Sequence, residues 1–115
     1  MKLTPQLVQF IAKQNKKYCK QLGLESPLYL FTDLELSGMV ESHKQFKSIR
    51  DGVIGESWHH KDTKLDYDIV YINVDSSDFL WQLVDGVVHE LVHLKYPNLR
   101  HGSKYQNTVN EVMML

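Results

Sequence analysis

Three histidines and a glutamate stand out in the segment "VVHELVHLKYPNLRHG" (87–102), which is otherwise rich in valine and leucine. In "HELVH", His89 and His93 are four residues apart, so on an α-helix both imidazoles project from one face, one turn above the other. Both rings could then bind one ion at about 2.0 to 2.1 Å. Glu90 lies too far round the helix to be a third ligand, but it could reach a metal-bound water as a general base.

The alternative is a core helix that carries histidines for no chemical reason. The apolar positions of 78–95 cover almost the whole circumference of a helix, so it should be buried on most sides. Burying an unpaired polar group costs on the order of 1 to 3 kcal/mol, and this segment has three such groups. A metal ion with its bound water would satisfy all three together, so we favour the metal site.

Two residues beyond the helix compete to be the third ligand. Pro97 ends the helix and the chain turns, so His101 could swing back toward the ion, with Gly102 allowing a sharp entry into the next helix. Glu111 lies one helix later and could face the same ion, although a solvated residue near the C-terminus is the simpler interpretation. We favour His101.

The run "HELVH", followed after a short turn by "HG" and then by Tyr105, resembles the catalytic core of the SprT-like and WLM zincin metallopeptidases. The resemblance is specific over about 87–105. It implies that His89, His93 and His101 bind zinc, that Glu90 is the catalytic base, and that Tyr105 packs under the site. The compact size and the "NE" at 110–111 are also similar to the archaeal minigluzincins, in which a glutamate is the third ligand. The extra DNA-binding and zinc-ribbon segments of larger relatives have no counterpart in this sequence, which puts a DNA-repair role in doubt.

These residues predict a zinc-dependent metallopeptidase that acts on a peptide or protein substrate, with one Zn²⁺ per chain. The spacing of the ligands alone predicts a metal-bound water that can hydrolyse a substrate. The resemblance to zincins implies that the bond hydrolysed is a peptide bond. One alternative is another zinc-dependent hydrolase, but Cys19 in "KYCKQ" does not resemble the cysteine-ligand motif of deformylases. Metal-dependent ribonucleases of ribosome maturation use three histidines without this glutamate. A non-catalytic binding module stabilised by zinc is the remaining alternative.

In zincins the strand before the active-site helix forms the rim of the cleft and receives the substrate as an added strand. By this resemblance the strand "YDIVYINV" (67–74) would present Tyr71 and Asn73 to the substrate. An ordinary structural edge strand is an equally good interpretation. His59 and His60 could bind substrate or polarise its carbonyl, but a solvated pair in a loop is the simpler expectation.

The elements expected around this motif form a small α+β domain with a mainly antiparallel or mixed sheet. Thr4 and Pro5 begin a helix over 5–22, and Gly23 ends it. A short buried strand follows Pro27, whereas 34–50 is ambiguous, and 52–60 indicates a strand whose glycines permit a bend. The strongest strand is 67–74. The polar cluster "DSSDF" should cap the active-site helix at 78–95, and a C-terminal helix runs from Ser103 to about 114.

Length, charge and hydropathy limit the class of protein. The 115 residues suit one domain, and 13 basic side chains nearly cancel 14 acidic ones, so there is no strong signal for nucleic-acid binding. No apolar run approaches the roughly 20 residues of a membrane-spanning helix, and the N-terminus lacks a secretory signal. The single Cys19, expected to be a small buried residue, fits a reducing compartment. We therefore expect a cytoplasmic monomer without membrane contact.

Overall fold

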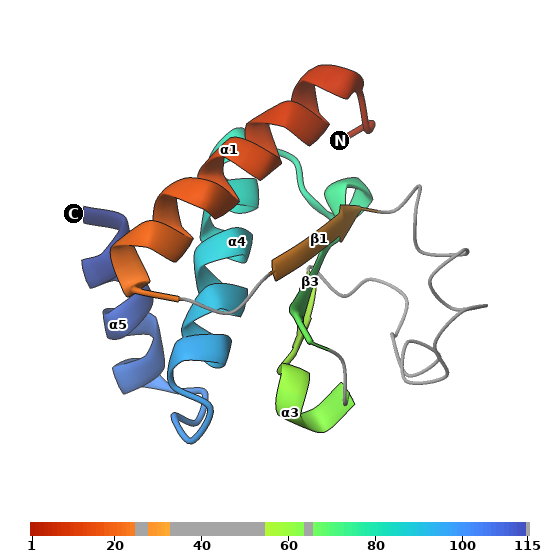
Figure 1. The fold of residues 1–115 in the computed structure, drawn as a ribbon. Coiled ribbons are helices and arrows are strands. Elements are labelled where there is room, and N and C mark those ends of the chain that lie inside the picture. The colour runs from red at the N-terminus through yellow and green to blue at the C-terminus, as the bar shows by residue number, and fades with distance from the viewer. Residues whose placement is uncertain (25–27, 33–54, 64–65, 115) are drawn as a thin grey trace.

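The computed structural model describes residues 1–24, 28–32, 55–63 and 66–114, and the ambiguous segment 34–50 lies outside these ranges. Their elements form an α+β fold (Figure 1). The helices are α1 (Pro5–Leu22), α3 (His60–Thr63), α4 (Leu80–Lys95) and α5 (Ser103–Met114), with a 3₁₀ turn η2 at Val74–Ser76. The strands are β1 (Leu28–Thr32), β2 (Gly55–Trp58) and β3 (Asp68–Ile72). No helix among the described residues is long and apolar enough to cross a membrane.

The three strands form one mixed sheet in the order β1-β3-β2. β3 pairs with β1 in parallel, with Leu28 opposite Asp68, and with β2 in antiparallel, with Gly55 opposite Ile72. The prediction of a mixed sheet is confirmed. Because β3 is paired on both sides and all five of its residues are buried, it is the centre of the sheet and not its edge.

Helix α1 begins and ends as its sequence predicts. The Thr4 hydroxyl accepts a hydrogen bond from the Leu7 amide at 3.2 Å, and Pro5 occupies the first turn. At the other end Gly23 adopts a left-handed conformation with φ of 67°, which costs glycine little because it has no Cβ. The predicted bounds of 5–22 are therefore confirmed.

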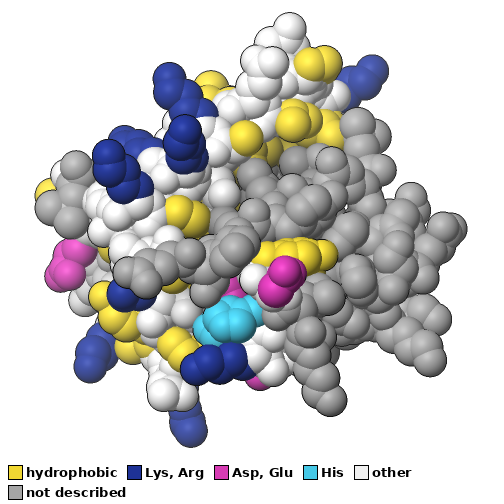
Figure 2. Space-filling view, in the orientation of Figure 1, with side chains coloured by type: hydrophobic (Ala, Val, Ile, Leu, Met, Phe, Trp, Pro, Cys, Tyr) yellow, Lys and Arg dark blue, Asp and Glu magenta, His cyan; other side chains and the backbone are white. Residues whose placement is uncertain are grey.

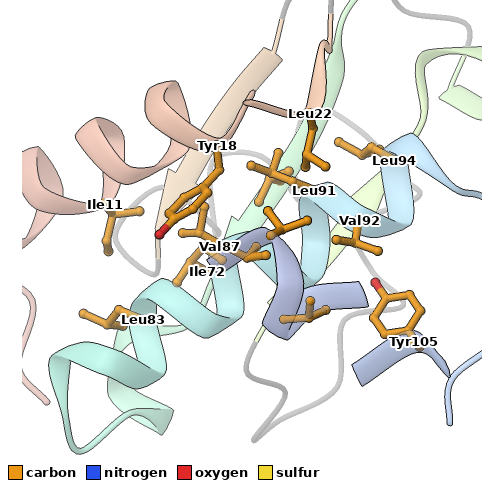
Figure 3. Close-up of a cluster of buried hydrophobic side chains, with 14 of the residues drawn as sticks. Ile11, Tyr18, Leu22, Ile72, Leu83, Val87, Leu91, Val92, Leu94 and Tyr105 are labelled. Atoms are coloured by element: carbon orange, nitrogen blue, oxygen red, sulfur yellow. The ribbon is translucent and has the colours of Figure 1, made fainter. Parts of the chain in front are cut away.

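Helix α4 is the centre of the hydrophobic core and contacts α1, α5, β2 and β3. Figure 3 shows Tyr18 of α1, Ile72 of β3 and Tyr105 of α5 converging on the apolar side chains of α4. The buried residues of this helix include apolar side chains on several faces and the acidic Glu90: Leu83, Gly86, Val87, Val88, Glu90, Leu91, Val92 and Leu94. The expectation that the motif helix is buried on most sides is confirmed over its last three turns.

The start of α4 differs from the prediction. The helix begins at Leu80, and no aspartate or serine side chain of "DSSDF" caps it. Instead the Gln82 side-chain oxygen accepts hydrogen bonds from the amides of Asp78 at 2.6 Å and Phe79 at 3.0 Å. From the first turn of α4, the glutamine thus holds the two residues that precede the helix. Phe79 and Trp81 remain about 60% exposed, so this end does not join the core.

The first residues of the predicted strand 52–60, 52–54, lie outside the described ranges, and the strand ends two residues early, at Trp58. The reason is Asp68, whose Oδ1 accepts hydrogen bonds from the His60 amide at 2.8 Å and from its ring Nδ1 at 2.7 Å. The chain then forms the short helix α3 from His60 to Thr63. The C-terminal helix α5 begins at Ser103 as predicted.

Candidate metal centre

The three histidines of the segment 87–102 meet at one point. Pro97 and the following turn reverse the chain after α4, and Gly102, with φ of 146°, makes the bend into α5. His101 Nε2 lies 2.8 Å from His93 Nε2 and 3.3 Å from His89 Nε2. Two nitrogens bound to a tetrahedral zinc at 2.0 to 2.1 Å are about 3.3 to 3.4 Å apart. The histidine nitrogens therefore fit a shared zinc ion with an adjustment of about half an ångström.

The electrostatic setting keeps these rings in the form that binds metal. Burial and the neighbouring His101 lower the pKa of His89, against an opposing effect of Asp85. Burial, followed by His89 and His101, lowers the pKa of His93 to about 4. Both imidazoles are consequently neutral near pH 7, and a neutral ring nitrogen is what a zinc ion requires.

Tyr105 forms the floor under the three rings. Its ring centroid lies 4.7 Å from that of His89, 4.6 Å from His93 and 5.1 Å from His101. The phenol is buried and donates a hydrogen bond to the backbone carbonyl of His89. Burial, and then the charge of Glu90, raise the pKa of this phenol, which stays protonated. The expectation that Tyr105 packs under the site is confirmed.

Glu90 is only 4% exposed and lies between α4 and the start of β2. Burial, and then the negative charge of Glu56, raise its pKa to about 8. Gly55 lies against it so closely that an added Cβ would be 3.3 Å from Glu90 Oε2 and 2.8 Å from the Tyr71 carbonyl oxygen. The glycine that the sequence suggested as a bend thus lets β2 approach the glutamate.

The histidines and Glu90 share one groove of about 720 Å³. Its walls come from β2, α3, α4, the turn after α4 and the start of α5. Figure 2 shows histidine and acidic side chains side by side at the surface of the molecule. The lining residues are Gly55, Glu56, Ser57, His59, Asp62, Asp85, Gly86, His89, Glu90, His93, Leu94, Pro97, His101 and Gln106. Of these, Asp62 and Asp85 had no role in the sequence interpretation: Asp62 is brought to the motif only by the fold, and Asp85 lies one turn before His89 on α4.

The rival ligand Glu111 lies away from this group. Its side chain is exposed and lines a separate pocket with Lys95 and Lys104. Glu111 follows Tyr105 by six residues, so on α5 it projects about 120° round the helix from Tyr105. The arrangement therefore favours His101 over Glu111.

The prediction that the strand 67–74 receives substrate at an exposed edge is wrong. Tyr71 is 3% exposed and is paired with Phe31 on one side and Glu56 on the other. Neither Tyr71 nor Asn73 is among the residues that line the groove. The sequence pattern shows that this strand is apolar but does not give the order of the strands, and β2 is the strand beside the groove.

A second group of possible metal ligands contains His59, His60 and Asp68. The two rings stack at 4.2 Å with an interplanar angle of 28°, and the ligand atoms of the three residues lie within 4.8 Å of one another. His60 Nδ1 contacts the buried Asp68 carboxylate, and His59 Nδ1 accepts a hydrogen bond from the Lys61 amide at 3.1 Å. We interpret this group as a hydrogen-bonded corner. The expectation of a solvated pair in a loop is wrong. The sequence feature that could have indicated this corner is Asp68, an aspartate at the start of the apolar strand β3.

Cys19 lies on α1 and is not part of either group of possible ligands. Burial, and then the charge of Asp68, raise the pKa of its thiol to about 11. Cys19 is half-buried against the core, so the expectation of a small buried residue is met only in part.

Comparisons with protein families, with curated proteins and with solved structures find no match to this chain. The interpretation of the groove therefore depends on its geometry and chemistry.

Proposed function

We propose that this protein is a zinc-dependent metallopeptidase of the minimal zincin type. The observation that supports it best is the convergence of three histidine nitrogens beside a buried carboxylate in an open groove. Histidine nitrogen is a preferred zinc donor, and three protein ligands with one open position are typical of catalytic zinc.

A zinc ion held by His89, His93 and His101 would supply a bound water whose pKa is lowered toward about 7, together with a Lewis acid for the substrate carbonyl. Glu90 would accept the proton of that water at its carboxylate and later donate it to the departing amine. The charge of a nearby cation would lower the pKa of Glu90 from about 8, and so favour the ionised form that a base needs. Gly55 would hold β2 against this carboxylate and limit its motion.

Two alternatives fit the arrangement less well. A purely structural zinc site is closed by four protein ligands, whereas among the described residues this group has three histidines and opens into a groove. A deformylase-type site needs a cysteine ligand, and Cys19 lies on α1 away from the histidines. Peptide or protein as substrate, action as a monomer and a cytoplasmic location remain predictions from the sequence.

The test compares the zinc-loaded wild type with Glu90→Gln and a matched control, Glu111→Gln, on a degenerate peptide mixture analysed by mass spectrometry. Loss of a general base costs about 10²- to 10⁴-fold in rate. We expect Glu90→Gln to keep its zinc and its fold but lose cleavage, with Glu111→Gln unchanged. Cleavage at the wild-type rate by Glu90→Gln would contradict the proposed base. Zinc binding without cleavage of any peptide by the wild type would favour the non-catalytic binding module.

A further inference from the structure

Acidic side chains line the groove on two sides of the histidines. Asp85 precedes His89 by one turn of α4, so it lines the part of the groove nearer the N-terminus of that helix. Asp62 lies on α3, which Figure 1 places at the end of the sheet where α4 also ends. A peptide lying along the groove would meet a carboxylate in both directions from the metal centre.

The two aspartates have no basic partner among the residues that the structure describes. In the described part of the chain, neither Asp62 nor Asp85 makes a hydrogen bond or ion pair through its carboxylate, and no lysine or arginine lines the groove. A basic side chain reaches the surface near the histidines in Figure 2, but outside that lining. Glu56 also lines the groove, but it has other interactions, so it is left out of the argument.

A second observation points to a ligand in the same place. The Glu90 side chain is 96% buried, lines the groove and has no hydrogen-bond partner among the described residues. Since Ser77 Oγ is the one fully buried side-chain atom without a partner among the described residues, the Glu90 oxygens open to the groove, where a ligand can contact them. One zinc ion contributes two positive charges, against three carboxylates even without Glu56. The groove with its metal therefore keeps a negative charge on both flanks.

We propose that the peptides bound in this groove carry lysine or arginine side chains beside the scissile bond, with Asp62 and Asp85 as their partners. This inference rests on the proposed metal centre. A lysine or arginine side chain of the peptide would be attracted by the carboxylate of Asp62 or of Asp85. A glutamate side chain would be repelled by either of them. The expected selection is for charge, because both aspartates lie at partly open positions where long basic side chains can reach them.

The experiment uses the full chain loaded with Co²⁺, whose visible absorption reports ligands at the metal. The probes are the hydroxamates of Nα-acetylated lysine, norleucine and glutamate, which share the same metal-binding group. The test variant is Asp62→Asn with Asp85→Asn. Its control is Asp66→Asn with Asp78→Asn, which changes the net charge equally at two exposed aspartates outside the groove.

We expect the wild type and the control to bind the lysine probe about tenfold more tightly than the glutamate probe at low ionic strength, with norleucine between them. This preference should fall below about twofold in the test variant, and for the wild type in about 1 M salt, because partly exposed charges are screened. Equal affinities for the three probes, or a preference that persists in the test variant, would overturn the inference while leaving the metal centre intact. A wild type that takes up no Co²⁺ would instead overturn the proposed function, and this inference with it.

Discussion

Replacing Gly55 by alanine should disturb the glutamate without touching the histidines. The new Cβ would lie 2.8 Å from the Tyr71 carbonyl oxygen and 3.2 Å from Glu90 Cγ. The first distance is shorter than any real Cβ contact, and its partner is backbone in the central strand, so β2 has to move away by about half an ångström. The second contact then decides whether Glu90 moves with it.

The cost follows from the kind of contact. Overpacking a well-packed site typically destabilises a protein by about 1 to 3 kcal/mol, and a clash with backbone oxygen belongs toward the upper part of that range. Because β2 and Glu90 form one wall of the groove, the proposed base should also be displaced. A misplacement of about 1 Å can cost about 10²-fold in rate. Zinc affinity should change little, since the three atoms nearest to the added Cβ belong to Tyr71 and Glu90 and not to a histidine.

Urea unfolding followed by circular dichroism measures the free energy, and zinc content and peptide cleavage are measured on the same samples. Ser57→Ala is the control in the same strand, because it removes atoms and adds none. We expect Gly55→Ala to lose stability and cleavage while retaining zinc. If Gly55→Ala is as stable as Ser57→Ala and cleaves at the wild-type rate, the close approach of β2 to Glu90 does not have the role described above.

Three further predictions concern the floor, the protonation and the corner of the site. Tyr105→Phe removes only the hydroxyl that donates to the His89 carbonyl and should cost about 1 kcal/mol by thermal unfolding, whereas Tyr105→Ala also removes the floor and should cost about 3 to 5 kcal/mol. Since the folded pKa of His93 is lowered to about 4, below its unfolded value near 6.5, the metal-free protein should lose stability as pH falls through this window. His93→Gln should flatten that part of a urea-midpoint against pH curve, and an unchanged slope would count against the lowered pKa. Asp68→Asn should weaken both hydrogen bonds to His60 and cost about 1 to 3 kcal/mol, and hydrogen exchange of the His60 amide should quicken.

Local sequence signals predicted the helices well. Thr4, Pro5 and Gly23 are local stop and start signals, and they placed α1 correctly at both ends. The i, i+4 spacing of His89 and His93 likewise needs only a helix to become a shared face. His101 was predicted as the third member because a proline turn leaves few directions for the chain to take.

Features that depend on contacts between distant segments were not predictable in this way. The order β1-β3-β2 decides that Tyr71 is enclosed and that β2 borders the groove, and no periodicity within a strand encodes that order. Asp68 ends the preceding strand through His60, eight residues earlier in the chain. The sequence suggested only that Gly55 permits a bend. Its contact with Glu90 could not be predicted, because folding alone brings these two distant residues together.

The central claim is that His89, His93 and His101 hold one zinc ion. Its most direct test is the metal content and zinc affinity of the purified protein, compared with His101→Ala and with Glu111→Ala. The account predicts one zinc per chain in the wild type and in Glu111→Ala. In His101→Ala the zinc affinity should fall by more than about 100-fold. Loss of a residue that only supports a ligand by a hydrogen bond already costs roughly 10- to 100-fold, and this substitution removes the ligand itself. A wild type that binds no zinc after reconstitution, or a loss of zinc in Glu111→Ala with none in His101→Ala, would contradict it.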